Sequence, residues 1–161
     1  MPKAVLLICA SALAPLAAAQ GYPAKPVRIV VGFAAGGGAD ILARTIGPRL
    51  GEALGQPIVI DNRPGAAGSI GVELVVKSAP DGYTLLMGFP GLATYPSLYT
   101  KLPYDPEKDL APVSLVGTVP NLLVVHPSVP VNSVKQLIAL ARAKPGQLNY
   151  ASPGKGTSLH L

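Results

Sequence analysis

Short apolar strands alternate with helical segments between residues 27 and 87, and this order restricts the folds that the chain can adopt. Three β-forming runs, 27–31, 58–60 and 83–87, are each preceded by glycine or proline. Between them, the spacing of apolar residues predicts helices over about 39–54 and 69–78. Each crossover is near the length that joins parallel strands. The order β-α-β-α-β therefore predicts half of a doubly wound α/β sheet.

Glycine and proline are frequent, with 18 of each among 161 residues. Their combined share is about twice the usual one. The apolar fraction of 49% argues against disorder, because disordered chains lack hydrophobic residues. Most of these glycines and prolines are therefore expected in turns between elements. Pro48 is an exception, because it lies inside the first predicted helix, where we expect a kink or a break.

The second half of the chain has a different pattern. Residues 88–104 contain three prolines and are expected to be irregular. A helix is predicted near 134–143, capped by Asn132 or Ser133. The chain ends on 157–161, which looks like the first turn of a helix, so we expect an incomplete sequence, with a short frayed terminus as the alternative. Further strands are predicted at 113–119, 121–125 and 147–151.

Residues 1–19 have the three-part layout of a secretory signal peptide. Lys3 precedes an apolar run, and three alanines ending at Ala19 satisfy the small-residue rule for cleavage. A membrane anchor is the alternative, but the run is too short for a bilayer core of about 30 Å and is broken by Pro15. Cleavage would remove Cys9, the only cysteine, and would lower the net charge of +5 by one. We expect a soluble, exported product that suits an oxidising compartment.

Three glycine-rich loops, 33–40, 88–91 and 152–157, follow predicted strands. Ligands of open α/β sheets bind at the carboxyl ends of the strands. A helix that begins after glycines presents free N–H groups and about half a unit of positive charge. Ser152 and Thr157 add hydroxyl donors to the third loop, and Lys155 adds a cation. We predict an anion site at this edge, with simple tight turns as the alternative.

Nucleotide-binding signatures do not fit these loops. Ile41 stands where the dinucleotide fingerprint has its third glycine, and Gly156 follows Lys155 where the P-loop has serine or threonine. A fourth glycine-rich segment, 61–68, is expected to be structural, because its acidic and basic residues can pair locally and its Pro-Gly pair favours a turn.

No catalytic or metal-binding arrangement is recognisable in the sequence. A Gly-x-Ser-x-Gly elbow is lacking, and neither His126 nor His160 has a second ligand at metal spacing. His126 is expected to be a surface or packing residue. His160 lies three residues after Thr157, on the same face of a helical turn, and is expected to contact a ligand rather than to catalyse. The charges are spread out, so we expect no cofactor and no nucleic acid partner.

Several motifs occur in one order along the chain. They are Tyr22-Pro23-x-Lys25-Pro26, Phe33-x-x-Gly36-Gly37-x-x-Asp40, Asp61-Asn62-Arg63-Pro64-Gly65, Asp81-Gly82-Tyr83, Lys101-Leu102-Pro103-Tyr104-Asp105-Pro106, Asn149-Tyr150-Ala151-Ser152 and Gly156-Thr157-Ser158-x-His160-Leu161. In this order the sequence resembles the Bug-type solute receptors, the periplasmic receptors of tripartite tricarboxylate transporters. The resemblance covers nearly all of the chain after residue 19.

The resemblance implies a two-lobed, flytrap-like α/β periplasmic binding protein that holds a small carboxylate between its lobes. Residues 20–112 would form the first lobe, and 113–161 the hinge strands and the start of the second. Members of the family are about twice as long, so most of the second lobe would be missing and apolar surface would be exposed. The segment 88–94 also lacks the polar run that is usual in the family. The implied ligand contacts are Phe33, Ala35, Gly36, Gly37, Gly38, Asp40, Gly88, Phe89, Gly91, Ser152, Gly156, Thr157 and His160.

The resemblance implies a periplasmic receptor that captures a small carboxylate for membrane transporter subunits and performs no chemistry. Two alternatives stay open. One is an exported α/β enzyme that acts on an anionic substrate with catalytic residues outside this sequence. The other is a ligand sensor that docks on the outer domain of a membrane kinase.

Overall fold

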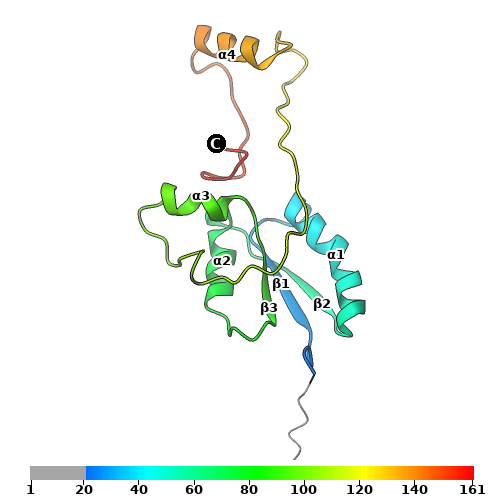
Figure 1. Ribbon diagram of the computed structural model, residues 1–161. Helices are drawn as coiled ribbons and strands as arrows, with labels where there is room; N and C mark the ends of the chain where they lie inside the picture. The colour runs from blue at the N-terminus through cyan, green and yellow to red at the C-terminus, as the bar shows by residue number, and fades with distance from the viewer. Residues whose placement is uncertain (1–20) are drawn as a thin grey trace, which may run out of the picture.

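The structure is a computed structural model, and it describes residues 21–161. The predicted signal peptide, 1–19, and Cys9 lie outside the described residues. In the part that the structure describes, no helix is both long and apolar enough to cross a membrane. Figure 1 shows a small sheet flanked by helices, with one further helix, α4, standing apart from the sheet.

The sheet has three parallel strands, β1 (Val27–Val31), β2 (Ile58–Asn62) and β3 (Thr84–Met87). Their order is β2-β1-β3, so the first strand in the sequence is the central one (Figure 1). In the register, Ile29 of β1 lies between Ile60 and Leu85. The strands predicted from the sequence are confirmed, and β2 extends two residues further than expected.

Helices α1 (Gly38–Leu54) and α2 (Ser69–Val76) connect these strands, as predicted. Parallel crossovers are right-handed, and the two crossovers leave β1 and β2 in opposite directions, so the helices cover opposite faces of the sheet. Ile29 and Val31 of β1 form the core under α1 with Ala43. Val30 points to the other face and is buried as well, which explains the unbroken apolar sequence of β1.

Pro48 does not break α1, which runs without interruption to a left-handed cap at Gly55. The expected break is therefore wrong. Gly47 is buried, and a Cβ there would lie 3.8 Å from the side chains of Ile58 and Ile60. We attribute the continuity of α1 to this packing against β2, because tertiary contacts compensate for one lost backbone hydrogen bond.

Residues 88–104 are not irregular throughout, because helix α3 (Gly91–Leu98) lies within them. The prediction was wrong because it took the prolines as helix breakers, whereas Pro90 precedes the helix and Pro96 lies inside it. Tyr95 has no exposed surface and is held between neighbouring aromatic rings. Burial of this side chain stabilises a helix that its own sequence disfavours.

The three further strands predicted in the second half are wrong, because 113–119, 121–125 and 147–151 form no sheet in the described chain. A strand needs a partner for its backbone groups, and the structure provides none for these segments within residues 21–161. Their apolar side chains are exposed, with Val113 at 82% and Leu122 at 81%. The exposed apolar surface agrees with what the sequence led us to expect.

Helix α4 (Val134–Ala143) is confirmed at its predicted bounds. Ser133 is the cap, because its hydroxyl oxygen accepts the N–H of Gln136 at 3.2 Å. The Gln136 side chain in turn accepts the N–H of Asn132, the residue before the cap, at 2.6 Å. The last residues form a single helical turn, in which the Leu161 N–H donates to the Thr157 carbonyl at 3.2 Å. The lobe boundary at residue 112 stays a prediction.

Candidate functional site

The candidate site lies at the carboxyl edge of the sheet, where loops leave all three strands. The C-terminal segment, red in Figure 1, lies beside α3 at this edge. It brings the third glycine loop, 152–157, next to segments that are about 60 residues or more away in the sequence. The structure therefore gathers the three predicted loops in one region of the molecule.

The first loop is exposed and lacks a side-chain cap. Residues 34–38 are all exposed, whereas Phe33 is half-buried. Gly37 is the N-cap of α1 and supplies no side-chain acceptor. The first hydrogen bond within the helix runs from the Ile41 N–H to the Gly37 carbonyl at 2.9 Å. The N–H groups of Gly38 and Ala39 thus face the loop without an intrahelical acceptor, which suits an anion.

Asp40 is almost fully buried, at 2% exposure, and its carboxylate is occupied by neighbouring donors. It accepts the N–H of Gly36 at 2.8 Å, the Arg44 guanidinium at 2.9 Å and the Asn62 amide at 3.0 Å. Asn62 also donates to the Phe33 carbonyl at 3.1 Å. The network ties the first loop to α1 and to the end of β2.

Hydrogen bonds lower the pKa of Asp40 from its ordinary value of 3.8 to about 2. The Arg44 guanidinium has the largest effect, and the Gly36 N–H and the Asn62 amide follow. The carboxylate is ionised at neutral pH and holds the loop in place. Direct contact between Asp40 and a ligand stays a prediction. Asn62 and Arg44 were missed, although Asp40 and Arg44 are four residues apart, a spacing that favours an ion pair on a helix.

The second loop supplies aromatic side chains. Phe89 packs edge to face against Phe33, with ring centroids 4.9 Å apart, and against Tyr95 at 5.7 Å. Gly88 is exposed, whereas Gly91 is buried beneath the rings of Phe89 and Tyr95. The structure thus brings Phe33 and Phe89 together as an apolar floor beside the exposed glycines of the first loop.

Tyr95 is buried and packs against the Phe89 ring of this floor. Burial raises the pKa of Tyr95 to about 12, so its hydroxyl stays protonated at neutral pH. The hydroxyl donates to the carbonyl of Ala67, in the short helix η1 (Ala66–Gly68). A Cβ on Gly68 would lie 2.8 Å from the Phe89 ring, so a side chain there would displace the floor.

The third loop brings Ser152 and His160 together, a pairing that the sequence did not predict. The Ser152 hydroxyl lies 2.9 Å from His160 Nδ1 and accepts the Gly154 N–H at 3.1 Å. The Tyr150 hydroxyl is 3.5 Å from the same imidazole nitrogen. Thr157 is buried, and its hydroxyl donates to the Gly154 carbonyl at 2.8 Å. Its hydroxyl is therefore used within the loop.

The fourth glycine-rich segment, 61–68, pairs its charges locally, as expected. The Arg63 guanidinium donates to both oxygens of Asp61, at 2.9 and 3.0 Å. Through Asn62 and Ala67, however, the same segment also supports the first loop and α3. Within residues 21–161, no group of three His, Cys, Asp or Glu residues is arranged to hold a metal ion.

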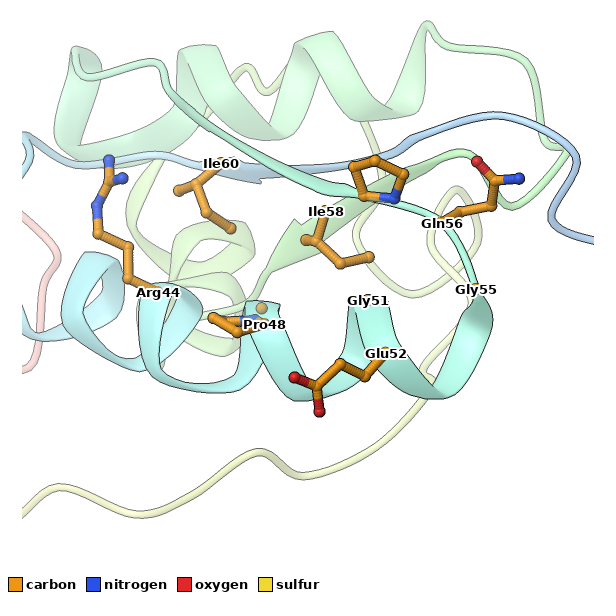
Figure 2. A pocket seen from close by; sticks show the side chains of 10 residues that line it. Arg44, Pro48, Gly51, Glu52, Gly55, Gln56, Ile58 and Ile60 are labelled. Atoms are coloured by element: carbon orange, nitrogen blue, oxygen red, sulfur yellow. The ribbon is translucent and has the colours of Figure 1, made fainter.

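A groove of about 620 Å³ lies elsewhere on the molecule, and none of the residues that line it belongs to the three glycine loops. Figure 2 shows it between α1 and β2, with Ile58 and Ile60 on the strand side and Pro48 on the helix side. Its lining is mainly apolar, with Arg44 and Glu52 as the charged members. The groove lacks the converging polar groups that a carboxylate needs, so the glycine loops remain the candidate site.

The parallel α/β lobe and its loops belong to the periplasmic binding protein class, and solved structures confirm this. R. palustris Rpa4515, solved with adipate, matches with a TM-score of 0.78 at 44% identity, over 84% of this chain and 46% of that chain. The periplasmic binding protein BugD matches with a TM-score of 0.73 at 33% identity, over 86% of this chain and 46% of that chain.

Residues 42–161 match the family described as "Tripartite tricarboxylate transporter family receptor", and the chain belongs to this family. It is 41% identical to Protein BugT of Bordetella pertussis over 158 residues. The matched region covers 97% of this chain and 48% of the relative. The chain therefore spans about half the length of the curated relatives it matches. The resemblance to Bug-type receptors is confirmed.

Proposed function

We propose that the protein is a periplasmic receptor that captures a small carboxylate for a tripartite tricarboxylate transporter and does not transform it. The observation that carries the proposal is the N-terminus of α1, which has no side-chain cap and follows an exposed glycine loop. Free N–H groups and the helix dipole favour a carboxylate without any cationic side chain. Rpa4515 was solved with adipate, and MatC of Rhodopseudomonas palustris, 40% identical, with bound malate.

Location and partners complete the proposal. Residues 1–19 would direct export to the periplasm and would be cleaved near Ala19. The loaded receptor would then deliver its ligand to the membrane subunits that the family description implies. Docking on the outer domain of a sensor kinase remains a further prediction about partners.

Calorimetry with the complete gene product tests the proposal. The panel is acetate, succinate, malate, adipate and citrate, and we expect at least one of them to bind with 1:1 stoichiometry. The diamides of succinate and adipate are the control, since they keep the shape and lose the charge; we expect them not to bind. Recovery of the ligand unchanged after incubation supports a receptor, whereas turnover would favour the enzyme. If no carboxylate binds, the proposed function is wrong.

A valine at Gly38 is expected to block the site without disturbing the fold. A Cβ at Gly38 would meet nothing within 4 Å, and its φ is not one that only glycine favours. The side chain would cover the open N–H groups at the start of α1, so we expect the affinity to fall about tenfold or more. The measurement is calorimetry with the same panel, next to a thermal melt.

Gly117→Val is the matched control for this variant, because Gly117 is exposed, lies outside the three glycine loops and is equally free of neighbours within 4 Å. We expect wild-type affinity for Gly117→Val, and melting temperatures close to wild type for both variants. Wild-type affinity in Gly38→Val would show that the ligand does not approach the start of α1.

A further inference from the structure

Two hydroxyl groups, of Thr94 in α3 and of Tyr99 at its C-terminal cap, hold the third glycine loop at the candidate site. The Tyr99 hydroxyl donates to the Lys155 carbonyl at 2.8 Å. The single proton of the Thr94 hydroxyl is shared between the Gly156 carbonyl at 2.9 Å and the Gly91 carbonyl of its own helix at 3.1 Å. The two loop carbonyls are 56 and 62 residues away from their donors in the sequence. These bonds join the last segment of the chain to the lobe that carries the other two loops.

The loop also fits closely against α3 and its neighbour η1. A Cβ on Gly156 would lie 3.0 Å from the Tyr95 ring, and a Cβ on Gly154 would lie 2.9 Å from that of Ala67. Both glycines have positive φ, of +89° and +139°, so the loop takes a backbone path that few other residues allow. This fit places the loop directly beside the residues that support the Phe33–Phe89 floor.

The chain between the lobe and the third loop contacts the segment after that loop through an exposed hydrogen bond, in which the Asn121 amide donates to the Ser158 carbonyl at 3.2 Å. Residues 112–126 have no regular structure and are exposed throughout. Helix α4, which follows them, has no buried residue. The bonds from Thr94 and Tyr99 therefore fix the third loop at its own residues, whereas the Asn121 bond reaches only the neighbouring Ser158.

The two bonds also control which backbone groups the loop can offer to an anion. A carbonyl oxygen carries partial negative charge and would repel a carboxylate. With the Lys155 and Gly156 carbonyls held on α3, these oxygens are kept occupied by donors. Since the peptide unit is planar and trans, the N–H that follows each carbonyl points the opposite way. Holding the Lys155 carbonyl thus fixes the orientation of the Gly156 N–H before any ligand arrives, whereas the Thr157 N–H, which follows the Gly156 carbonyl, already donates to the Gly154 carbonyl at 3.3 Å.

We propose that Thr94 and Tyr99 are positioning residues, which pre-organise the third glycine loop for carboxylate binding through hydrogen bonds to its carbonyls. The proposal rests on the proposed function and deepens it, because it assigns to α3 a role in the affinity of that site. Neither side chain was among the residues implied by the family resemblance.

The test combines Thr94→Val and Tyr99→Phe in the complete gene product, with the five-member carboxylate panel as probe. Each variant loses one hydrogen bond to the loop, so we expect a loss of affinity of about threefold to tenfold for each, and a larger loss for both together. Hydrogen–deuterium exchange without any ligand gives a second readout. We expect faster exchange in residues 154–158 of the double variant, and unchanged exchange in α1.

Matched controls remove equivalent hydroxyls elsewhere. Thr45 donates to the Ile41 carbonyl at 2.7 Å on the exposed side of α1, and Tyr22 donates to the Gly82 carbonyl at 2.6 Å. Thr45→Val combined with Tyr22→Phe is expected to leave both affinity and loop exchange unchanged. Thr94→Ser keeps the donor, and we expect it to bind within about threefold of wild type.

The possible results separate the two proposals. If the wild type binds no member of the panel, the proposed function fails, while the exchange data still decide whether α3 orders the loop. If the wild type binds and the double variant binds equally well, the role of Thr94 and Tyr99 is refuted. An equal loss in the Thr45→Val and Tyr22→Phe control would refute it too, since the effect would then be general.

Discussion

Replacing Gly32 with alanine is expected to destabilise the protein by about 3 kcal/mol, at the upper end of the usual cost of overpacking. An added Cβ would lie 2.8 Å from the Gly68 carbonyl oxygen and 2.9 Å from the Gly68 Cα. Both are backbone atoms, so no side-chain rotation can relieve the clash. Gly71 meets the same constraint from the other side, because its Cβ would lie 2.9 Å from the Gly32 Cα. The end of β1 and the start of α2 touch through their main chains.

Denaturant unfolding of the mature chain measures this effect, as a shift in the midpoint at constant slope. Gly47→Ala is the matched control. Gly47 is also buried, but a Cβ there would make only ordinary contacts at 3.8 Å. Because alanine favours the helix, we expect this control to be neutral or stabilising by up to about 1 kcal/mol. A stability for Gly32→Ala equal to that of the control would disprove the close approach.

Asp40→Asn is expected to lower the melting temperature at neutral pH and to change its dependence on acid. The folded protein holds the pKa of Asp40 at about 2, below its ordinary value of 3.8. Its stabilising contribution is therefore complete above the ordinary value and is lost as the pH falls through about 2. In the wild type, Arg44, the Gly36 N–H and Asn62 all donate to the charged carboxylate of Asp40. Asparagine would offer these donors a single neutral oxygen. The variant should lack this part of the acid-induced destabilisation.

Melting temperatures recorded from pH 7 down to pH 2 test this prediction. Asp105→Asn is the control, since the Lys108 ammonium also lowers the pKa of Asp105, but in an exposed pair. Water and salt screen such a pair, so we expect a small change that shrinks further at high ionic strength. Parallel curves for wild type and Asp40→Asn between pH 4 and pH 2 would contradict the proposed role of the buried carboxylate.

The β-α-β-α-β unit of residues 27–87 could be predicted because its signals are local. Each strand of the β-α-β-α-β unit is a short apolar run behind a glycine or a proline, and each helix shows its own periodicity. Helix α3 could not be predicted in this way. Its stability comes from the burial of Tyr95 against residues that are distant in the sequence. The strands expected over 113–125 failed for the opposite reason, because a good strand sequence forms no sheet without a partner.

The same distinction applies to the candidate site. The glycine loops were visible in the sequence, because a glycine run before a helix has a local meaning. The donors that hold these loops were not visible. Asn62 reaches Asp40 because β2 lies beside β1, and Thr94 reaches Gly156 because the chain returns to α3. Neither neighbour relation can be derived from spacing along the chain.

The strand order has a consequence for how the chain acquires its structure as it is synthesised. The central strand, β1, is made first, and both of its edges stay open until its neighbours follow. The three strands that residues 21–161 contribute to the sheet have all been made once residue 87 has emerged. Domains generally fold as units during synthesis, starting from the N-terminus. Of the three glycine loops, the one carried by Gly154–Thr157 is therefore made last, and it meets an α3 surface that is already formed.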